Sequence, residues 1–444
     1  MQSEGDWSAG LRHGAFLSRP LTRHAGGRRS AFKFVSAARL PELGRVKHCK
    51  HIRIALLTVL SLVGLTGRTL ADDRARLEQT EMFVSGTDGY HTYRIPAMIA
   101  TPKGTLLAFC EGRKNGAGDS GDIDLLHKRS TDGGKSWGTQ TVIWDDATNT
   151  CGNPCAVVDQ QTGDIWLLLT HNLGTDTEAR IKAKTASRSR TVWVCRSSDD
   201  GQTWSKPVEI TSQTKDPTWG WYATGPGVGI QIQHGAHRGR LVIPCDHTYD
   251  VVSGSSHGVH VEFGAHVIFS DDHGATWKLG GVIRPKVNEC QVVELADGKG
   301  TLLMNLRAYI GHSRRAEATS RDGGLTWTAP QDQPALIEPV CQASFLRRSW
   351  PGKTNVSQLL FSNPADEKRR RNFTVRLSRD EGKTWPVART LHEGPAAYSC
   401  LVALPDGRIG CLYERGEKSA YERITFATFP LEWLTAGTEV PAGK

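Results

Sequence analysis

An eight-residue pattern that recurs five times limits what this chain can fold into. Serine, aspartate, glycine, a hydroxyl residue and tryptophan hold fixed places within it, and the copies lie at 130–137, 197–204, 270–277, 320–327 and 378–385. The aspartate and hydroxyl side chains can accept hydrogen bonds from nearby amides, glycine tolerates a positive φ, and tryptophan can anchor a turn on a core. Apolar runs precede most copies. We therefore predict that each copy is a tight turn between two antiparallel strands.

The pattern has a functional alternative, a calcium-binding loop, because an aspartate followed closely by glycine also belongs to EF-hands. The repeats lack carboxylates at alternate positions and the closing glutamate, and no helical segments flank them. We therefore interpret the repeats as scaffold and predict no metal site.

The spacing of the repeats predicts the architecture. The first serine of each copy lies at 130, 197, 270, 320 or 378, so four intervals span 248 residues and average 62. Strand-turn-strand units at a fixed period indicate a propeller or a solenoid. Residues 72–444 number 373, close to six such intervals. We predict an all-β fold, a single six-bladed β-propeller over 72–444, closed by pairing of strand 423–429 with the N-terminal part of the chain.

Residues 1–71 have the features of a leader. A basic stretch at 50–53 precedes an apolar run at 54–65 and small residues at 69–71. A secretory signal has this order, whereas a transmembrane helix needs a longer apolar run. We expect an N-terminal extension with a signal cleaved after Ala71, a secreted or periplasmic product, and no permanent membrane anchor. The alternatives are a buried helix and a membrane anchor.

The leader also accounts for the net charge. Residues 1–71 hold 12 basic and 3 acidic residues, and this excess of +9 equals that of the whole chain. The remainder carries 43 residues of each sign. A basic chain would suggest a nucleic-acid partner, but a neutral 72–444 removes that argument. We expect no nucleic-acid partner.

The cysteines favour buried thiols. Nine of the ten cysteines lie after the leader, an odd number. Cys151 and Cys155 are the only close pair, and export would permit a disulfide between them. Most of the others lie inside apolar runs, where free cysteine behaves as a small hydrophobic residue. No Cys/His spacing indicates zinc.

Charged residues also occur inside the apolar runs that we expect to form strands, or directly after them. Arg94 lies within the run 93–97, and an arginine buried inside a propeller needs a partner. The loop 114–122, rich in glycine and carboxylates, follows an apolar run. Such loops on a rigid scaffold often carry functional sites.

The sequence Tyr93-Arg94-Ile95-Pro96, together with the five repeats, resembles the exo-α-sialidases (neuraminidases), in particular the bacterial and animal enzymes with Asp-box repeats. The resemblance covers about residues 82–434. It implies a monomeric glycoside hydrolase that needs no cofactor and has sialylated glycoconjugates as partners.

The resemblance assigns an arginine triad to Arg94, Arg307 and Arg370, with neighbouring arginines around the third. Sialic acid carries a carboxylate on its anomeric carbon, and a planar guanidinium can bind a carboxylate through two parallel hydrogen bonds. Glu414 matches the glutamate that holds the first arginine. Without the resemblance, each arginine alone would be read as part of a surface salt bridge.

The resemblance also implies the catalytic groups. Tyr398 matches the nucleophile, Glu289 its partner, and Asp119 the acid/base, with Asp122 as the fallback. A neutral phenol avoids repulsion by the carboxylate of the substrate, and Glu289 can take its proton. Asp119 would protonate the leaving oxygen, for which we expect a raised pKa. Without the resemblance, Tyr398 would be read as packed and Asp119 as solvated.

Two further contacts are left open. Trp219, Trp221 and Tyr222 either line the glycerol or N-acyl side of the pocket or pack in the core. Asp246 is a candidate for contact with a substrate hydroxyl.

The sequence therefore predicts an exo-α-sialidase that releases terminal α-linked sialic acid with retention through a tyrosyl intermediate. A trans-sialidase or an intramolecular, anhydro-forming sialidase would use the same residues. A non-catalytic Asp-box propeller that binds glycans is the alternative from another class, and it would lack the nucleophile or its base.

Overall fold

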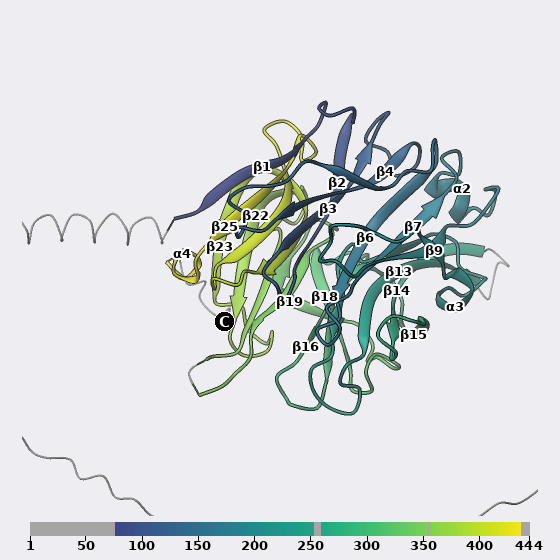
Figure 1. Cartoon of the computed structure of the whole chain (residues 1–444). Helices are drawn as coiled ribbons and strands as arrows, with labels where there is room; N and C mark the ends of the chain where they lie inside the picture. The colour runs from purple at the N-terminus through teal and green to yellow at the C-terminus, as the bar shows by residue number, and fades with distance from the viewer. Residues whose placement is uncertain (1–75, 253–258, 354, 437–444) are drawn as a thin grey trace, which may run out of the picture. The chain divides into compact units, whose positions relative to one another are not determined.

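The five repeats form turns between antiparallel strands, in a computed structural model that describes residues 76–252, 259–353 and 355–436 (Figure 1). In the first repeat the amide of Gly134 donates to Ser130 Oγ at 2.9 Å, and the amide of Ser136 donates to Asp132 Oδ1 at 3.0 Å. The serine accepts from the glycine four residues on in the other copies as well. The turn prediction is confirmed.

The tryptophan of each repeat anchors its turn. Trp137 lies edge-on to Phe426, with ring centroids 5.3 Å apart. Gly134, at φ +87°, packs against the same ring, where an added Cβ would lie 2.3 Å from Phe426 Cε1. All five repeat tryptophans pack against apolar clusters: Trp137, Trp204, Trp277, Trp327 and Trp385.

The strands form four hydrogen-bonded sheets in the described residues. One contains β2 (Thr92–Ala100), β3 (Leu106–Arg113), β4 (Ile123–Ser130), β5 (Thr141–Trp144), β6 (Thr150–Val158), β7 (Ile165–Asn172), β8 (Thr191–Ser197), β9 (Val208–Glu209) and β11 (Gly227–Val228). A second contains β10 (Tyr222–Thr224), β12 (Ile230–Gln231), β13 (Leu241–Val252), β14 (Val259–Ser270) and β15 (Lys278–Ile283). A third contains β16 (Val287–Glu294), β17 (Leu302–Ala308), β18 (Arg314–Ser320) and β19 (Gln331–Ile337).

The fourth sheet joins the two ends of the described chain. It contains β1 (Glu78–Val84), β20 (Ser344–Ser349), β21 (Gln358–Pro364), β22 (Arg371–Ser378), β23 (Val387–Ala403), β24 (Ile409–Arg415) and β25 (Arg423–Phe429). Strand β1 pairs antiparallel with β25, which confirms the predicted pairing of the C-terminal strand with the N-terminal part of the chain. The described residues also form three short helices: α2 (Glu178–Lys182), α3 (Thr211–Thr214) and α4 (Leu431–Thr435).

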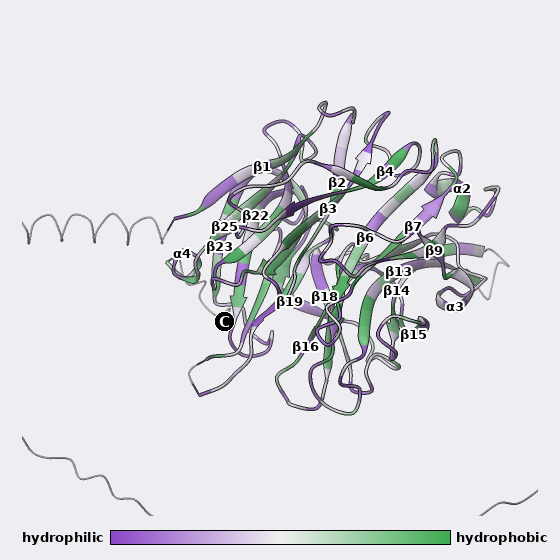
Figure 2. Cartoon of the chain, viewed as in Figure 1, coloured by the Kyte–Doolittle hydropathy of each residue, from purple (hydrophilic) through white to green (hydrophobic). Residues whose placement is uncertain are grey.

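The sheets are arranged like parts of a propeller. Strands β2, β6, β13, β16, β20 and β23 contact one another in this order, and β23 also contacts β2. Many strand residues are apolar, whereas the connecting loops are mostly polar (Figure 2). The fold is thus all-β, as predicted. The predicted leader and cleavage site at 1–71 lie outside the described residues.

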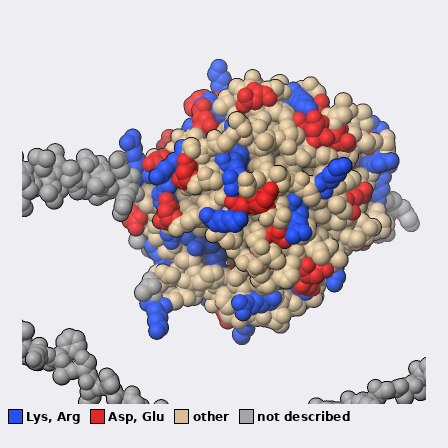
Figure 3. Space-filling view, viewed as in Figure 1, with Lys and Arg blue, Asp and Glu red and all other residues tan. Residues whose placement is uncertain are grey.

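Charged side chains of both signs are interspersed on the face seen in Figure 3. This distribution agrees with the equal number of acidic and basic residues after the leader. In the part of the chain that the structure describes, no helix is both long and apolar enough to cross a bilayer. No group of His, Cys, Asp and Glu in that part is arranged to hold a metal ion.

The described cysteines are free, buried thiols. Cys151 and Cys155 both lie on β6, and the possible bridge between them is not formed. Burial raises the pKa of these thiols, for example that of Cys341 to about 11. Because the thiolate is the reactive form, such groups react slowly.

We expect these thiols to resist alkylation while the protein is folded. Iodoacetamide labelling followed by peptide mass spectrometry, with and without urea, would measure this. Labelling should be fast only in urea, because unfolding restores both solvent access and an ordinary thiol pKa. Fast labelling of Cys151 in the folded protein, or a disulfide-linked peptide containing it, would contradict the prediction.

Candidate active site

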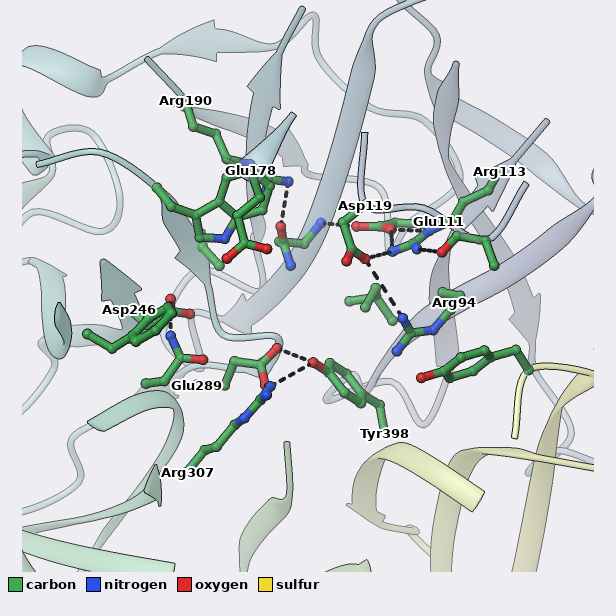
Figure 4. Close-up of a pocket in the computed structure, with 18 of the residues that line it drawn as sticks. Arg94, Glu111, Arg113, Asp119, Glu178, Arg190, Asp246, Glu289, Arg307 and Tyr398 are labelled. Carbon is green, nitrogen blue, oxygen red and sulfur yellow. Dashed lines mark hydrogen bonds and ion pairs between the residues drawn. The ribbon is translucent and has the colours of Figure 1, made fainter. Parts of the chain in front are cut away.

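A pocket of about 290 Å³ collects nearly all the residues that the sequence singled out (Figure 4). They come from strands and loops of all four sheets. Those that line the pocket are Arg94, Asp119, Trp221, Asp246, Glu289, Arg307, Arg370 and Tyr398.

Irregularities in the inner strands aim several of these side chains. The pairing of β2 with β3 shifts register after Arg94, that of β16 with β17 shifts around Glu289, and that of β23 with β24 shifts around Tyr398. Ile95, which follows Arg94, has a φ of +62°, which a β-branched residue rarely adopts. Bulges re-aim side chains and are common beside active sites. Local strain of this kind also concentrates at such sites.

Glu414, which does not itself line the pocket, holds Arg94. Its carboxylate is fully buried and accepts from Arg94 Nε at 3.0 Å and Nη2 at 3.3 Å. The same carboxylate accepts from the backbone amides of Ile95 at 2.9 Å and Tyr398 at 3.0 Å. One side chain of β24 therefore fixes both an arginine of the pocket and the backbone of the tyrosine.

The other two arginines also lie close to Tyr398. Arg307 Nη1 lies 2.6 Å from Glu289 Oε2 and 3.2 Å from the Tyr398 hydroxyl. Arg370 Nη1 donates to the hydroxyl of Tyr421 at 2.9 Å. The structure thus brings the three predicted arginines into one pocket.

Tyr398 and Glu289 form a short hydrogen bond. The Tyr398 hydroxyl donates to Glu289 Oε1 at 2.5 Å, and both residues are buried. Burial, followed by the charge of Glu289, raises the pKa of Tyr398 well above its usual value, although Arg307, Arg370 and Arg94 oppose this shift. The phenol is therefore neutral in the free protein, and its proton is shared in a hydrogen bond with Glu289.

Asp119 lies in the loop between β3 and β4, with its side chain 54% exposed. Its carboxylate is 2.8 Å from Arg113 Nη2 and 3.8 Å from Arg94 Nη1. Desolvation raises the pKa of Asp119, but the charges of Arg113 and Arg94 outweigh it, so the pKa is lowered. The expectation of a raised pKa is therefore wrong for the free protein. The fallback residue Asp122 does not line the pocket.

The structure places the aromatic residues and Asp246, whose contacts the sequence left open. Trp221 lines the pocket, with Arg190 Cζ 3.8 Å from its ring centroid, whereas Trp219 and Tyr222 belong to the core. Asp246 also lines the pocket and accepts from Asn288 Nδ2 at 2.8 Å. Burial, followed by the charge of Glu289, raises the pKa of Asp246 well above its usual value.

Sequence reasoning missed several lining residues. Arg113 is almost fully buried and bonds to Glu111, 2.6 Å away, as well as to Asp119. The sequence Glu-Gly-Arg at the end of an apolar run was the available signal for this pair. Nothing local marked the others, which include Asn153, Glu178, Arg190, Asn288, Tyr309 and Tyr421.

Comparisons with known proteins agree on one family. The family model described as "BNR repeat-like domain" matches residues 104–411. The chain is 35% identical to a sialidase of Micromonospora viridifaciens over 373 residues, which cover 80% of this chain and 54% of that protein. It is 34% identical to a sialidase of Bacteroides fragilis, with 78% and 64% covered. It is 31% identical to sialidase-3 of Mus musculus, with 76% and 91% covered.

The chain thus spans between half and two thirds of the two bacterial sialidases and nearly all of the mouse protein. Among solved structures, a Hadza microbial sialidase is 32% identical, with a TM-score of 0.68 and coverage of 80% of this chain and 69% of that one. The intramolecular trans-sialidase from Ruminococcus gnavus shares the fold at 19% identity, with a TM-score of 0.66 and coverage of 80% and 98%.

Proposed function

This chain belongs to the sialidase family, and we propose that it is an exo-α-sialidase, which releases terminal α-linked sialic acid from glycoproteins, glycolipids and oligosaccharides. The observation that carries the proposal is the 2.5 Å hydrogen bond from Tyr398 to Glu289 in a pocket lined by three arginines. A buried phenol beside a carboxylate base is suited to nucleophilic attack. Tyrosine nucleophiles are a known departure from the usual carboxylate among glycosidases.

Binding would begin at the arginines. The carboxylate of sialic acid can accept hydrogen bonds from Arg94, Arg307 and Arg370, whose guanidinium groups are held by Glu414, Glu289 and Tyr421, respectively. Paired guanidinium hydrogen bonds fix a carboxylate in orientation as well as in place. The anomeric carbon would then lie over the Tyr398 hydroxyl.

The first chemical step forms the tyrosyl intermediate. The Tyr398 oxygen attacks the anomeric carbon while its proton passes to Glu289. The bond to the leaving oxygen breaks, and Asp119 supplies the proton that this oxygen takes up. Because the phenol stays neutral until attack, it does not repel the carboxylate of the approaching sugar.

The second step hydrolyses the intermediate. Asp119, now ionised, removes a proton from a water molecule, which attacks the anomeric carbon as the bond to Tyr398 breaks. Glu289 returns its proton to the departing phenolate. Two displacements at one carbon give overall retention.

We expect substrate binding to raise the pKa of Asp119. In the free protein Arg113 and Arg94 lower it. A substrate carboxylate on Arg94 would offset part of that charge and add a negative charge nearby, and such changes shift a pKa by about 1 to 3 units. Asp119 must be protonated for the first step, so activity is present below its pKa and falls as pH rises through it.

The pH profiles of kcat and kcat/KM would measure this shift, because they report the complex and the free protein, respectively. With 3′-sialyllactose, the alkaline limb of kcat should lie about 1 pH unit or more above that of kcat/KM. An Asp119→Asn variant should lack the limb and serves as the control. Coincident limbs would contradict the prediction.

We also propose that the unit is a closed six-bladed β-propeller, in which β23 serves two adjacent blades. The support is the cycle of contacts through β2, β6, β13, β16, β20 and β23.

We also propose that the protein is secreted or periplasmic, because a basic stretch precedes an apolar run within residues 50–65. We propose that it is a monomer, because the residues that line the pocket all come from one chain.

NMR of the first product formed from 3′-sialyllactose would test the function. The α-anomer of free sialic acid, observed before mutarotation, would support retaining hydrolysis. An anhydro sugar as the product would indicate an intramolecular sialidase, and a transferred sialoside would indicate a trans-sialidase. In both cases the assignment of the site would stand and the reaction would not be hydrolysis. No reaction by folded protein across several linkages would favour a glycan-binding propeller.

A further inference from the structure

The loop that carries Asp119 is closed at its base by Lys114. The amide of Lys114 donates to the carbonyl of Asp122 at 3.0 Å, so the loop begins and ends at neighbouring residues. The Lys114 side chain lies among three carboxylates, with Nζ 3.0 Å from Asp122, 3.1 Å from Asp124 and 3.4 Å from Asp145. We call these four residues the lysine clamp.

The lysine clamp joins three segments of one sheet. Asp122 ends the loop, Asp124 lies on β4, and Asp145 follows β5. Asp124 is buried, and its Oδ2 also accepts from the hydroxyl of Tyr90 at 2.6 Å. Three carboxylates this close would repel one another without a cation. An ammonium group has three donors and a compact charge, which suits this arrangement.

Asp119 itself has few other restraints. It is half-exposed, and among the described residues its ion-pair partners are two arginines, Arg113 and Arg94. Arg113 Nη1 also donates to the carbonyl of Ala117 at 2.5 Å, which supports one side of the loop. The opposite side, which returns to β4, is supported by two sets of contacts. Asp122 and Asp124 bind Lys114 in the lysine clamp. Gly121 donates its amide to Thr150 Oγ1 at 3.1 Å and accepts from that hydroxyl at 3.0 Å. Lys114 is therefore the side chain that ties the end of the loop, three positions from Asp119, to β4 and to the residue that follows β5.

We propose that Lys114 is a positioning residue for proton transfer by Asp119, a role that rests on the function proposed above. Lys114 does not line the pocket, so it acts on the reaction only through the loop. A general acid must lie within hydrogen-bond reach of the leaving oxygen. A displacement of about 1 Å can cost about 100-fold in rate.

The test compares two substrates that differ in their need for a proton. A 4-nitrophenyl sialoside has a good leaving group and needs little protonation, whereas 3′-sialyllactose has a poor one. In Lys114→Met we expect kcat on sialyllactose to fall about 10- to 100-fold, with less than about a threefold loss on the aryl substrate. Lys114→Arg, which keeps the charge, should restore part of the loss.

Lys128 provides a matched control on β4. Its Nζ donates to the carbonyl of Met82 at 2.6 Å, and it does not line the pocket. Lys128→Met should leave the ratio of the two rates unchanged. Asp119→Ala should change that ratio in the same direction as Lys114→Met and by more. Retained activity on the aryl substrate would also show that Lys114→Met is folded.

Two results would overturn the role of Lys114 without affecting the proposed function. Wild-type activity on both substrates with an unchanged ratio in Lys114→Met would exclude the role. An equal loss on both substrates would show that Lys114 stabilises the fold instead. If the folded wild-type protein hydrolysed neither substrate, the proposed function would fail, and the role of Lys114 would fail with it.

Discussion

Tyr398→Phe should reduce turnover by at least about 1,000-fold while the protein remains folded, the range seen when an enzyme loses its nucleophile. The change removes the oxygen that attacks the anomeric carbon and leaves the ring in place. It also leaves Glu289 paired with Arg307 Nη1 at 2.6 Å, so the carboxylate keeps a cationic partner. Steady-state hydrolysis of 3′-sialyllactose, with circular dichroism to monitor folding, would measure the effect.

Tyr413→Phe is the matched control. The Tyr413 ring is fully buried, and its hydroxyl donates to Gln79 Oε1 at 2.8 Å outside the pocket. Loss of one such hydrogen bond costs about 1 kcal/mol of stability, and kcat should not change. Near-native hydrolysis by Tyr398→Phe would exclude this tyrosine as the nucleophile. Equal losses in both variants would point to a general effect on folding.

The turns were predictable because their hydrogen bonds are local. In every copy, the serine and aspartate side chains lie within a few residues of the amides that donate to them, as between Ser130 and Ser136. Their spacing in sequence therefore fixes their spacing in space. The pairing of β1 with β25 spans nearly the whole described chain. It too was predictable, because a propeller predicted from the repeats has to pair its last strand with the N-terminal part of the chain.

The charge state of Asp119 was not predictable from the residues around it in sequence. Its pKa depends on the distances from one carboxylate oxygen to Arg113 and Arg94. These distances are set by the end of β3 and by the bulge of β2. Lining residues such as Arg190 and Glu178 were missed for the same reason. Each is an isolated charged residue that sequence alone places at a strand end or on a surface.

Glu414→Gln should destabilise the fold by about 3 kcal/mol or more, because removing one partner of a buried ion pair leaves the other charge without compensation. Among the residues that the structure describes, Arg94 would keep one carboxylate partner, Asp119, which is half-exposed and 3.8 Å away. A glutamine has one oxygen to serve the amides of Ile95 and Tyr398, which both donate to the carboxylate now. Urea unfolding followed by tryptophan fluorescence would give the free energy difference.

A double-mutant cycle separates the charge from the packing. Arg94→Met combined with Glu414→Gln should be less destabilised than Glu414→Gln alone, because the double variant leaves no unpaired charge at the site. Glu317→Gln is the control, since Glu317 accepts its hydrogen bonds from the side-chain amides of Asn305 and Gln333, and it should cost less than about 1 kcal/mol. Additive effects of the two changes would mean that Arg94 and Glu414 do not stabilise one another. The pocket would then be held by the strand register and the bulge at Ile95, and Glu414 would serve mainly as an acceptor for the two amides.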